Sequence, residues 1–357
     1  MEPEKSFSPV LSEIPRYPAG TDFGADRFAA RRIPTLNIAL FLLTWLTTTM
    51  AGAYMAGADF SLARPLGSAT ALESGLSFSI PLMLILLAHE FGHYLFARRH
   101  DVDTSLPYFI PAPFPSFFLI GTFGAFIRMR SLPRSRRVMF DIGAAGPWFG
   151  MLLAVPAVII GLHYSSIAPL NQSGGGLELG NSILFLGLSK WILGVDPNAV
   201  NVNLSPIAFA GWLGFFVTTL NLLPSGQFDG GHVIYALFGR RHRMISRLAV
   251  AFCVLMVIVP LILGKNYWGG WLLWAVLLIF LGLGHPTTLD ADTPLDSRRR
   301  IAAWLTVVLF IITFSPVPLS FEPPTAAPGG GKTYQVMLHA PAPEFHFSSM
   351  RIGARKT

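Results

Sequence analysis

The sequence is poor in charge and has almost no cysteine. Asp, Glu, Lys and Arg make up 13% of its 357 residues, about half the share usual in soluble proteins, while 52% of the residues are hydrophobic. A soluble fold of this length could not bury so much apolar surface, and a disordered or collagen-like chain would have another composition. The single cysteine, Cys253, excludes a disulfide framework and a thiolate metal site. The composition therefore predicts an all-α polytopic membrane protein in which His, Asp or Glu holds any metal.

Long apolar stretches recur along the chain and are separated by polar segments. About seven of them approach the roughly 20 residues that a helix needs to cross a bilayer. They lie near 35–57, 75–97, 140–162, 206–224, 248–264, 269–285 and 301–320, the last three within a C-terminal block at 236–320. Residues 1–34 are expected to form a disordered polar arm without a signal peptide, and residues 321–357 a flexible tail. The shorter apolar stretch at 180–195 is expected to form an interfacial helix.

Basic residues alternate from one connecting segment to the next. The N-terminal arm and the segments after the second, fourth and sixth predicted spans hold 19 of the 26 Lys and Arg residues, and the segments after the first, third and fifth hold 3. The positive-inside rule then places the N-terminus in the cytoplasm. The net charge of +7 thus reflects topology and does not indicate a nucleic-acid partner. By the same count the tail lies outside, although it carries four basic residues.

The second predicted span contains ionisable residues, which are costly in lipid and therefore indicate a function. Its sequence includes His89-Glu90-Phe91-Gly92-His93. Residues four apart share one face of a helix, so both imidazoles can bind one metal ion with Glu90 beside it. A polar cluster that only holds helices together is the structural alternative.

A hydrolytic zinc site usually has three protein ligands and one open position. The other acidic residues within or beside spans are Asp141, which flanks the third, and Asp229, which follows the fourth. Pro224 and the glycines near Asp229 are expected to unwind the helix, which a membrane protein tolerates only where the backbone lines an enclosed or wet cavity. The second and fourth spans run in the same direction, so Asp229 can lie at the depth of His89 near the cytoplasmic side.

Two motifs together resemble the site-2 protease family of intramembrane zinc metalloproteases. They are HEFGH in the second span and NLLPSGQFDG two spans later. The similarity extends through GAAGPWFG at 143–150, and more loosely through 121–130 and 284–290. No stretch is long enough for the PDZ domain or the CBS repeats of some members, so a member without either is expected.

The resemblance implies a three-helix catalytic core within residues 74–235. In that core His89, His93 and Asp229 would hold one zinc ion per chain, and Glu90 would be the catalytic base. It also implies a substrate that is a transmembrane segment of another protein in the lipid bilayer, often one already cut by another protease.

Further residues near these motifs have open interpretations. Asn221 is a candidate oxyanion donor or substrate contact, and an interhelical hydrogen bond is an equal alternative. His232 is a candidate ligand or proton relay, with a cytoplasmic surface position favoured. Gly146 and Gly150 are expected to let the third span pack closely against the ligand helices. No function is expected for five histidines that are placed on the surface: His100, His163, His242, His339 and His346. For His285, packing at a helix end is favoured over a catalytic role.

Residues 105–130 are too rich in proline for a helix and too apolar for an ordinary loop. A membrane-associated loop or β-hairpin next to the site is expected. Because a helical substrate must be unwound before hydrolysis, an exposed strand edge here could hold it by strand addition. A structural plug that seals the cavity is the alternative.

Two other functions are compatible with a metal site in a membrane. A CaaX-type membrane metalloprotease also carries HExxH in a span, but it is expected to use Glu as the third ligand. A zinc transporter or metal-dependent scaffold is expected to have polar residues along several spans, whereas here they gather at one depth.

Overall fold

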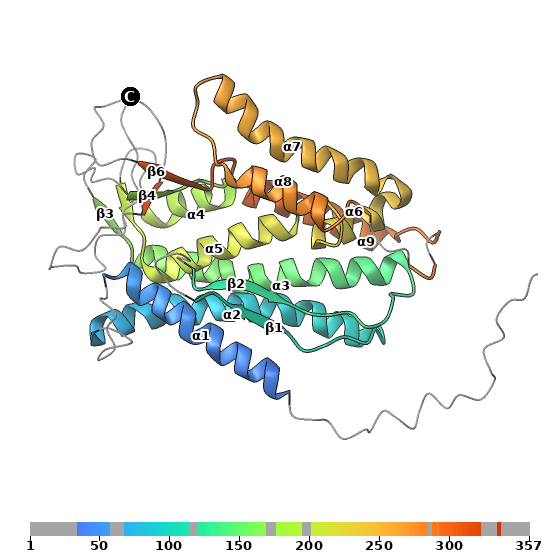
Figure 1. Ribbon diagram of the computed structural model, residues 1–357, viewed down its shortest axis with the longest axis horizontal. Helices are drawn as coiled ribbons and strands as arrows, with labels where there is room; N and C mark the ends of the chain where they lie inside the picture. The colour runs from blue at the N-terminus through green and yellow to red at the C-terminus, as the bar shows by residue number, and fades with distance from the viewer. Residues whose placement is uncertain are drawn as a thin grey trace, which may run out of the picture. The chain divides into compact units, whose positions relative to one another are not determined.

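The computed structural model describes residues 34–57, 68–113, 120–168, 176–194, 201–284, 288–290, 292–322 and 334–336 (Figure 1). By its internal contacts the chain divides into Met1–Thr35 and Leu36–Thr357, and nearly all of the described structure belongs to the second unit. The predicted arm at 1–34, except for its last residue, and most of the predicted tail at 321–357 lie outside the described residues.

Helices stand at all seven predicted positions. They are α1 (Thr35–Met55), α2 (Ala69–Arg99), α3 (Arg136–His163), α5 (Pro206–Asn221), α7 (His242–Ile262), α8 (Gly270–Phe280) and α9 (Ser297–Thr313). In the described part of the chain, four helical segments are long and apolar enough to cross a membrane: α1, α2, α3 and Asp229–Ile262, which joins α6 (Asp229–Phe238), a short 3-10 helix (Gly239–Arg241) and α7. The chain is thus a mostly helical, polytopic membrane protein. Seven spans stays a prediction, because the apolar runs at 206–224, 269–285 and 301–320 extend beyond the helices they contain and these helices are not among the four candidate spans.

Three helices form the packed centre, with α3 in contact with both α2 and α5. Glycines allow this approach: a Cβ on Gly92 of α2 would lie 2.7 Å from the Ala145 carbonyl oxygen, and one on Gly161 of α3 only 2.1 Å from the Ala208 amide. Fully buried apolar side chains such as Phe78 fill the interior between the helices. The predicted three-helix core is therefore present, and it gives the site a rigid support.

Serine side chains define where these three helices begin. Ser68, Ser135 and Ser205 precede α2, α3 and α5, and each hydroxyl accepts a hydrogen bond from a backbone amide of the first turn. Such an N-cap satisfies one of the amides that a helix start leaves without a partner, and contributes about 1 kcal/mol.

A β-hairpin occupies the segment predicted at 105–130. Its strands β1 (Tyr108–Pro111) and β2 (Thr122–Phe126) are antiparallel, with an irregular register between Phe109 and Pro111. This confirms the predicted hairpin, whereas its insertion into the membrane stays a prediction. The predicted short helix at 180–195 is also present, as α4 (Ile183–Leu193).

Short strands join segments that are far apart in the sequence. β3 (Ser166–Ala168) pairs with β5 (Asn201–Asn203), and β4 (Gly176–Leu179) lies between β6 (Leu319–Glu322) and β7 (Tyr334–Val336). The pairing of β4 with β6 brings the segment that follows α9 beside the segment that follows α3. The predicted topology places these two segments on the same side of the membrane, and their side stays a prediction.

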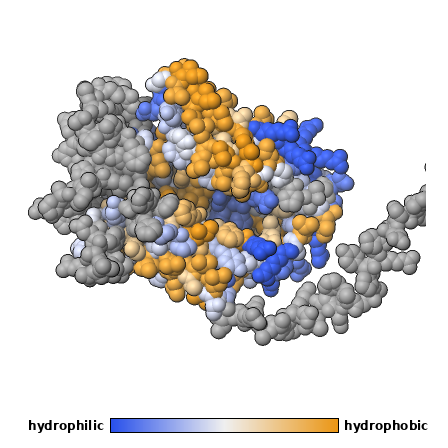
Figure 2. All heavy atoms as spheres, in the orientation of Figure 1, coloured by the Kyte–Doolittle hydropathy of each residue, from blue (hydrophilic) through white to orange (hydrophobic). Residues whose placement is uncertain are grey.

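The basic segments meet at the opposite end of the helices. Arg136 donates a hydrogen bond to the Ala236 carbonyl, and Arg137 donates one to the Pro294 carbonyl. Figure 2 shows hydrophilic residues gathered at that end of the viewed face and hydrophobic residues across the helices beside it. The connections after the second, fourth and sixth predicted spans thus contact one another, while their side of the membrane stays a prediction.

Candidate metal centre

The HEFGH motif lies in the interior of α2, with its ionisable side chains buried. His89, Glu90 and His93 are each no more than 6% exposed. The two imidazoles stand one turn apart on one face of the helix, and their Nε2 atoms are 3.2 Å apart. The helical spacing therefore produces the convergence of two ligands that the sequence predicts.

The third side chain reaches the site through a break in the helical structure. α5 ends at Asn221 and α6 begins at Asp229, and the residues between them are not helical. The chain folds tightly on itself here, since a Cβ on Gly230 would lie 2.0 Å from the Leu222 carbonyl oxygen. Gly226 has a positive φ of 55°, which disfavours residues with a side chain. Proline and glycine thus unwind the segment as predicted, and the turn carries Asp229 to α2.

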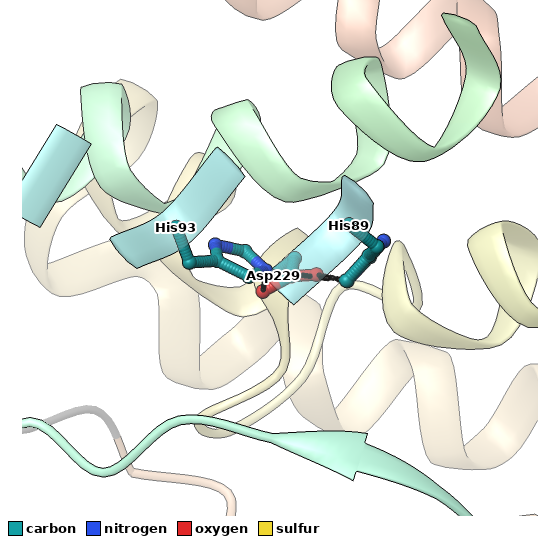
Figure 3. A group of neighbouring side chains, drawn as sticks. All are labelled: His89, His93 and Asp229. Carbon is teal, nitrogen blue, oxygen red and sulfur yellow. Dashed lines mark hydrogen bonds and ion pairs between the residues drawn. The ribbon is translucent and has the colours of Figure 1, made fainter. Parts of the chain in front are cut away.

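The Asp229 carboxylate faces both imidazoles (Figure 3). Its Oδ2 lies 3.2 Å from Nε2 of His89, and its Oδ1 lies 3.3 Å from Nε2 of His93. Two ligand atoms of a tetrahedral zinc ion, each at about 2.0 Å from the metal, are separated by about 3.3 Å. Within the described residues, His89, His93 and Asp229 form the group of His, Cys, Asp or Glu side chains that could hold a metal ion. The donor set fits zinc in both chemistry and spacing.

A contact from α3 fixes the orientation of one imidazole. Nδ1 of His93 donates a hydrogen bond to the carbonyl oxygen of Ile142, 2.8 Å away. With the proton on Nδ1, the lone pair of Nε2 is available to a metal. The structure thus supplies the supporting partner that metal-binding histidines ordinarily have.

Small residues of α3 leave room for the imidazoles. A Cβ on Gly146 would lie 2.0 Å from Nε2 of His93, and one on Gly150 would lie 3.3 Å from His89. The prediction that this Gly-rich stretch allows close helix packing is therefore confirmed. α3 packs directly on the two histidines of α2.

Asp141, the other acidic candidate, lies in a different cluster. Its Oδ2 is 2.9 Å from Nε2 of His100 and 2.7 Å from a guanidinium nitrogen of Arg299. Arg299 also pairs with Asp296, whose side chain caps the start of α9. Hydrogen bonds from the backbone and then the side chain of Arg299 lower the pKa of Asp296 to about 2. This cluster ties α9 to α2 and α3 and takes no part in the metal centre.

A cavity of about 490 Å³ opens beside the three candidate ligands. Glu90, Asn221 and His232 line it together with the segment from the end of β2 onward, Ala125 to Pro133. The backbone of Ile127 interacts with the Glu90 carboxylate. Figure 2 shows hydrophilic residues at the bottom of a hollow near the centre of the viewed face. A carboxylate, the candidate ligands and one end of the hairpin therefore share one space large enough for a short peptide segment.

Asn221 lies at the site, as expected from its position before the turn. Its Nδ2 donates a hydrogen bond to Nε2 of His89 over 3.1 Å. This contact is compatible with both predicted roles, so the choice between a substrate donor and a packing contact stays a prediction.

The favoured surface positions of two histidines are wrong. His232 is 7% exposed, because α6 packs against α3 where Gly143 leaves space for its side chain. It lies three residues after Asp229 and shares that face of α6, a spacing already present in the sequence. His242 is 6% exposed and hydrogen bonds through Nδ1 to the carbonyl of Gly239.

The other predicted histidine positions have mixed outcomes. His163 is exposed, as expected, and His100 is half-buried against Asp141. The last three histidines lie outside the described residues: His285, His339 and His346.

Comparison with known proteins assigns these features a family. The family model described as "Peptidase family M50" matches residues 77–264, which include both motifs of the site. The chain is similar to the "probable zinc metalloprotease EGY2, chloroplastic" of Oryza sativa subsp. indica, with 28% identity over 255 residues, 71% of this chain and 44% of the relative. The EGY1 protein of Arabidopsis thaliana with the corresponding name is 30% identical over 254 residues, 69% of this chain and 44% of the relative. EGY2 of Arabidopsis thaliana is 25% identical over 321 residues, 89% of this chain and 52% of the relative. The chain thus spans about half the length of the curated relatives it matches.

Proposed function

Because this chain belongs to peptidase family M50, we propose that it is a zinc-dependent endopeptidase that cuts a membrane protein within or near a transmembrane segment. The observation that carries the proposal is the convergence of His89, His93 and Asp229 beside Glu90, between apolar helices. The third candidate ligand is an aspartate, whereas a CaaX-type protease is expected to use a glutamate. The polar groups converge on one cavity, whereas a transporter requires a polar path along several spans.

The side chains of the site have distinct roles in this proposal. His89, His93 and Asp229 would hold the zinc ion, which when bound lowers the pKa of a water molecule and polarises the scissile carbonyl. Glu90 follows His89 directly and lines the same cavity, so its carboxylate takes a proton from the attacking water and returns it to the leaving amine. The amide of Asn221 lies at the edge of the cavity, where it can donate to the carbonyl oxygen as negative charge develops.

The β-hairpin is the proposed place of substrate binding. A transmembrane helix resists hydrolysis while its amides are hydrogen-bonded within the helix. β2 belongs to a two-stranded sheet, and the residues from its end onward line the cavity beside Glu90. An extended substrate added along this edge would pass the catalytic carboxylate with its backbone aligned.

The membrane setting follows from the exposed side chains. Large hydrophobic residues are exposed on α1, α7 and α8, including Leu42, Leu255 and Leu273. These faces suit lipid contact, and the proposed substrate would reach the cavity from the bilayer. The resemblance also suggests a substrate already shortened by another protease. The active site would lie toward the cytoplasmic side, at the end of the helices that carries the basic segments.

The test is Glu90→Gln in the purified, zinc-loaded protein with a model transmembrane substrate in liposomes. The variant should lose turnover by at least about a hundredfold, the lower range for general base catalysis, while its zinc content is unchanged. The matched control is Glu73→Gln, because Glu73 lies on the same helix, is exposed and does not line this cavity. Equal turnover of Glu90→Gln and wild type would overturn the assignment of the base, and no turnover by the wild type would overturn the proposed activity.

A further inference from the structure

Helix α1 holds the β-hairpin at two places. Nδ2 of Asn37 donates hydrogen bonds to the carbonyls of Leu106 and Pro107, at 3.1 and 2.8 Å, immediately before β1. The hydroxyl of Thr47 donates to the carbonyl of Gly121, at 2.7 Å, immediately before β2. Asn37 and Thr47 are ten residues apart, which corresponds to about 15 Å along a helix. The two contacts therefore fix both the position and the direction of the hairpin along α1.

The contact at Gly121 leaves no space for a side chain at this position. Gly121 has a positive φ of 75°, and a Cβ there would lie 2.4 Å from the carbonyl oxygen of Thr47. Between the two polar contacts, the ring of Phe41 meets that of Phe109 edge to face, with centroids 5.0 Å apart. Phe109 is only 2% exposed. The surfaces of α1 and the hairpin are thus complementary in shape, beyond what three chance hydrogen bonds would require.

The far end of the same hairpin reaches the catalytic carboxylate. The carbonyl of Gly121 that receives the Thr47 hydroxyl also accepts a hydrogen bond from the Ala112 amide across the hairpin. Ala125 and Phe126, at the end of β2, line the cavity, and the next residue, Ile127, interacts with Glu90. Three strand residues, 122–124, therefore separate Gly121 from Ala125 in the cavity wall, a distance of about 14 Å at most.

We infer that α1 is a positioning element for substrate binding: through Asn37 and Thr47 it sets where the edge of β2 lies relative to Glu90. This inference rests on the proposed function. α1 contributes none of the candidate ligands and lies before residues 77–264, the part that matches the family model. α1 therefore affects how tightly the hairpin binds an extended substrate, and it does not affect the metal centre.

The experiment compares Thr47→Val and Asn37→Leu with two matched variants. Thr48→Val is the control, because in the described part of the chain the Thr48 hydroxyl bonds to the Thr44 and Trp45 carbonyls of its own helix and not to the hairpin. Thr47→Ser keeps the hydroxyl and should therefore keep the KM of the wild type. In the zinc-loaded protein, Thr47→Val should raise KM for the model transmembrane substrate about threefold to tenfold, the range for losing one neutral hydrogen bond. Asn37→Leu loses two hydrogen bonds and should raise KM at least as much. The value of kcat and the zinc content should stay within twofold of the wild type, as should every parameter of Thr48→Val and Thr47→Ser.

A second readout does not depend on turnover. In Thr47→Val the amides of Ala112 and Ser105, which donate hydrogen bonds to the Gly121 and Arg128 carbonyls across the hairpin, should exchange with deuterium faster than in Thr48→Val. An unchanged KM with unchanged exchange in Thr47→Val would overturn the inference, and so would an equal rise of KM in Thr48→Val. If the wild type has no activity, the proposed function fails while the exchange measurement still tests whether α1 holds the hairpin.

Discussion

Replacing Gly146 with alanine is expected to disable the metal centre without touching a ligand. The new methyl carbon would lie 2.0 Å from Nε2 of His93, whereas an ordinary contact begins at 3.4 Å. The imidazole must therefore move by about 1.4 Å or α3 must separate from α2. Either movement breaks the hydrogen bond from His93 to Ile142 and the alignment with Asp229.

The expected magnitude follows from these geometric losses. Disturbing the partners that orient a metal ligand typically lowers affinity about 10-fold to 100-fold, and displacing the donor atom itself should cost at least as much. Glycine to alanine within a helix favours the helix by about 1 kcal/mol, so loss of zinc would not be explained by helix propensity. The assay is zinc affinity of the purified protein by competition with a chromophoric chelator, with circular dichroism to confirm the helical content.

Gly150→Ala is the matched control. It makes the same change one turn further along α3, where the new Cβ would lie 3.3 Å from His89, a distance that needs only a shift of a few tenths of an ångström. Its zinc affinity should stay within a few-fold of the wild type. Zinc binding by Gly146→Ala at wild-type affinity would refute the packing argument, and an equal loss in both variants would show that α3 cannot accept any added methyl group.

Two further predictions concern the cluster outside the metal centre. Asp141→Asn should lower the free energy of unfolding by about 1 kcal/mol, because the Arg299 side chain is 35% exposed and keeps Asp296 as a partner. Zinc content should be unchanged. Chemical denaturation in detergent measures the stability and metal analysis the zinc, and an unchanged stability would contradict the assigned ion pair. Asp296 has a lowered pKa of about 2, so the stability it contributes is present above its unfolded pKa near 4 and is lost as pH falls from about 4 toward 2. The difference in Tm between wild type and Asp296→Asn should therefore shrink over that pH range, and a constant difference would contradict the shift.

Much of the site could be predicted from the sequence because its residues are unusual for their surroundings. Histidine and glutamate within an apolar helix are costly, so their spacing indicates a shared ligand. Pro224 and the nearby glycines end the helix for local steric reasons, which is why the break before Asp229 could be placed. The hairpin could be anticipated from the proline and β-branched content of its segment.

The features that the sequence does not predict depend on contacts between residues far apart in the chain. Nothing in the sequence near Asp141 indicates that Arg299, 158 residues later, is its partner. The same holds for Thr47 and Gly121, which are 74 residues apart. The burial of His232, in contrast, is indicated by the sequence, since helical spacing places it on the face of Asp229. The number of spans could not be fixed because apolar runs do not reveal where a short helix gives way to a turn.

Zinc content of the purified protein tests the central claim most directly. The wild type and Asp141→Asn should each carry one zinc ion per chain by mass spectrometry, while Asp229→Ala, dialysed against the same dilute chelator, should retain less than about a tenth of it. Full zinc occupancy in Asp229→Ala would contradict the proposed metal centre and, with it, the proposed hydrolysis.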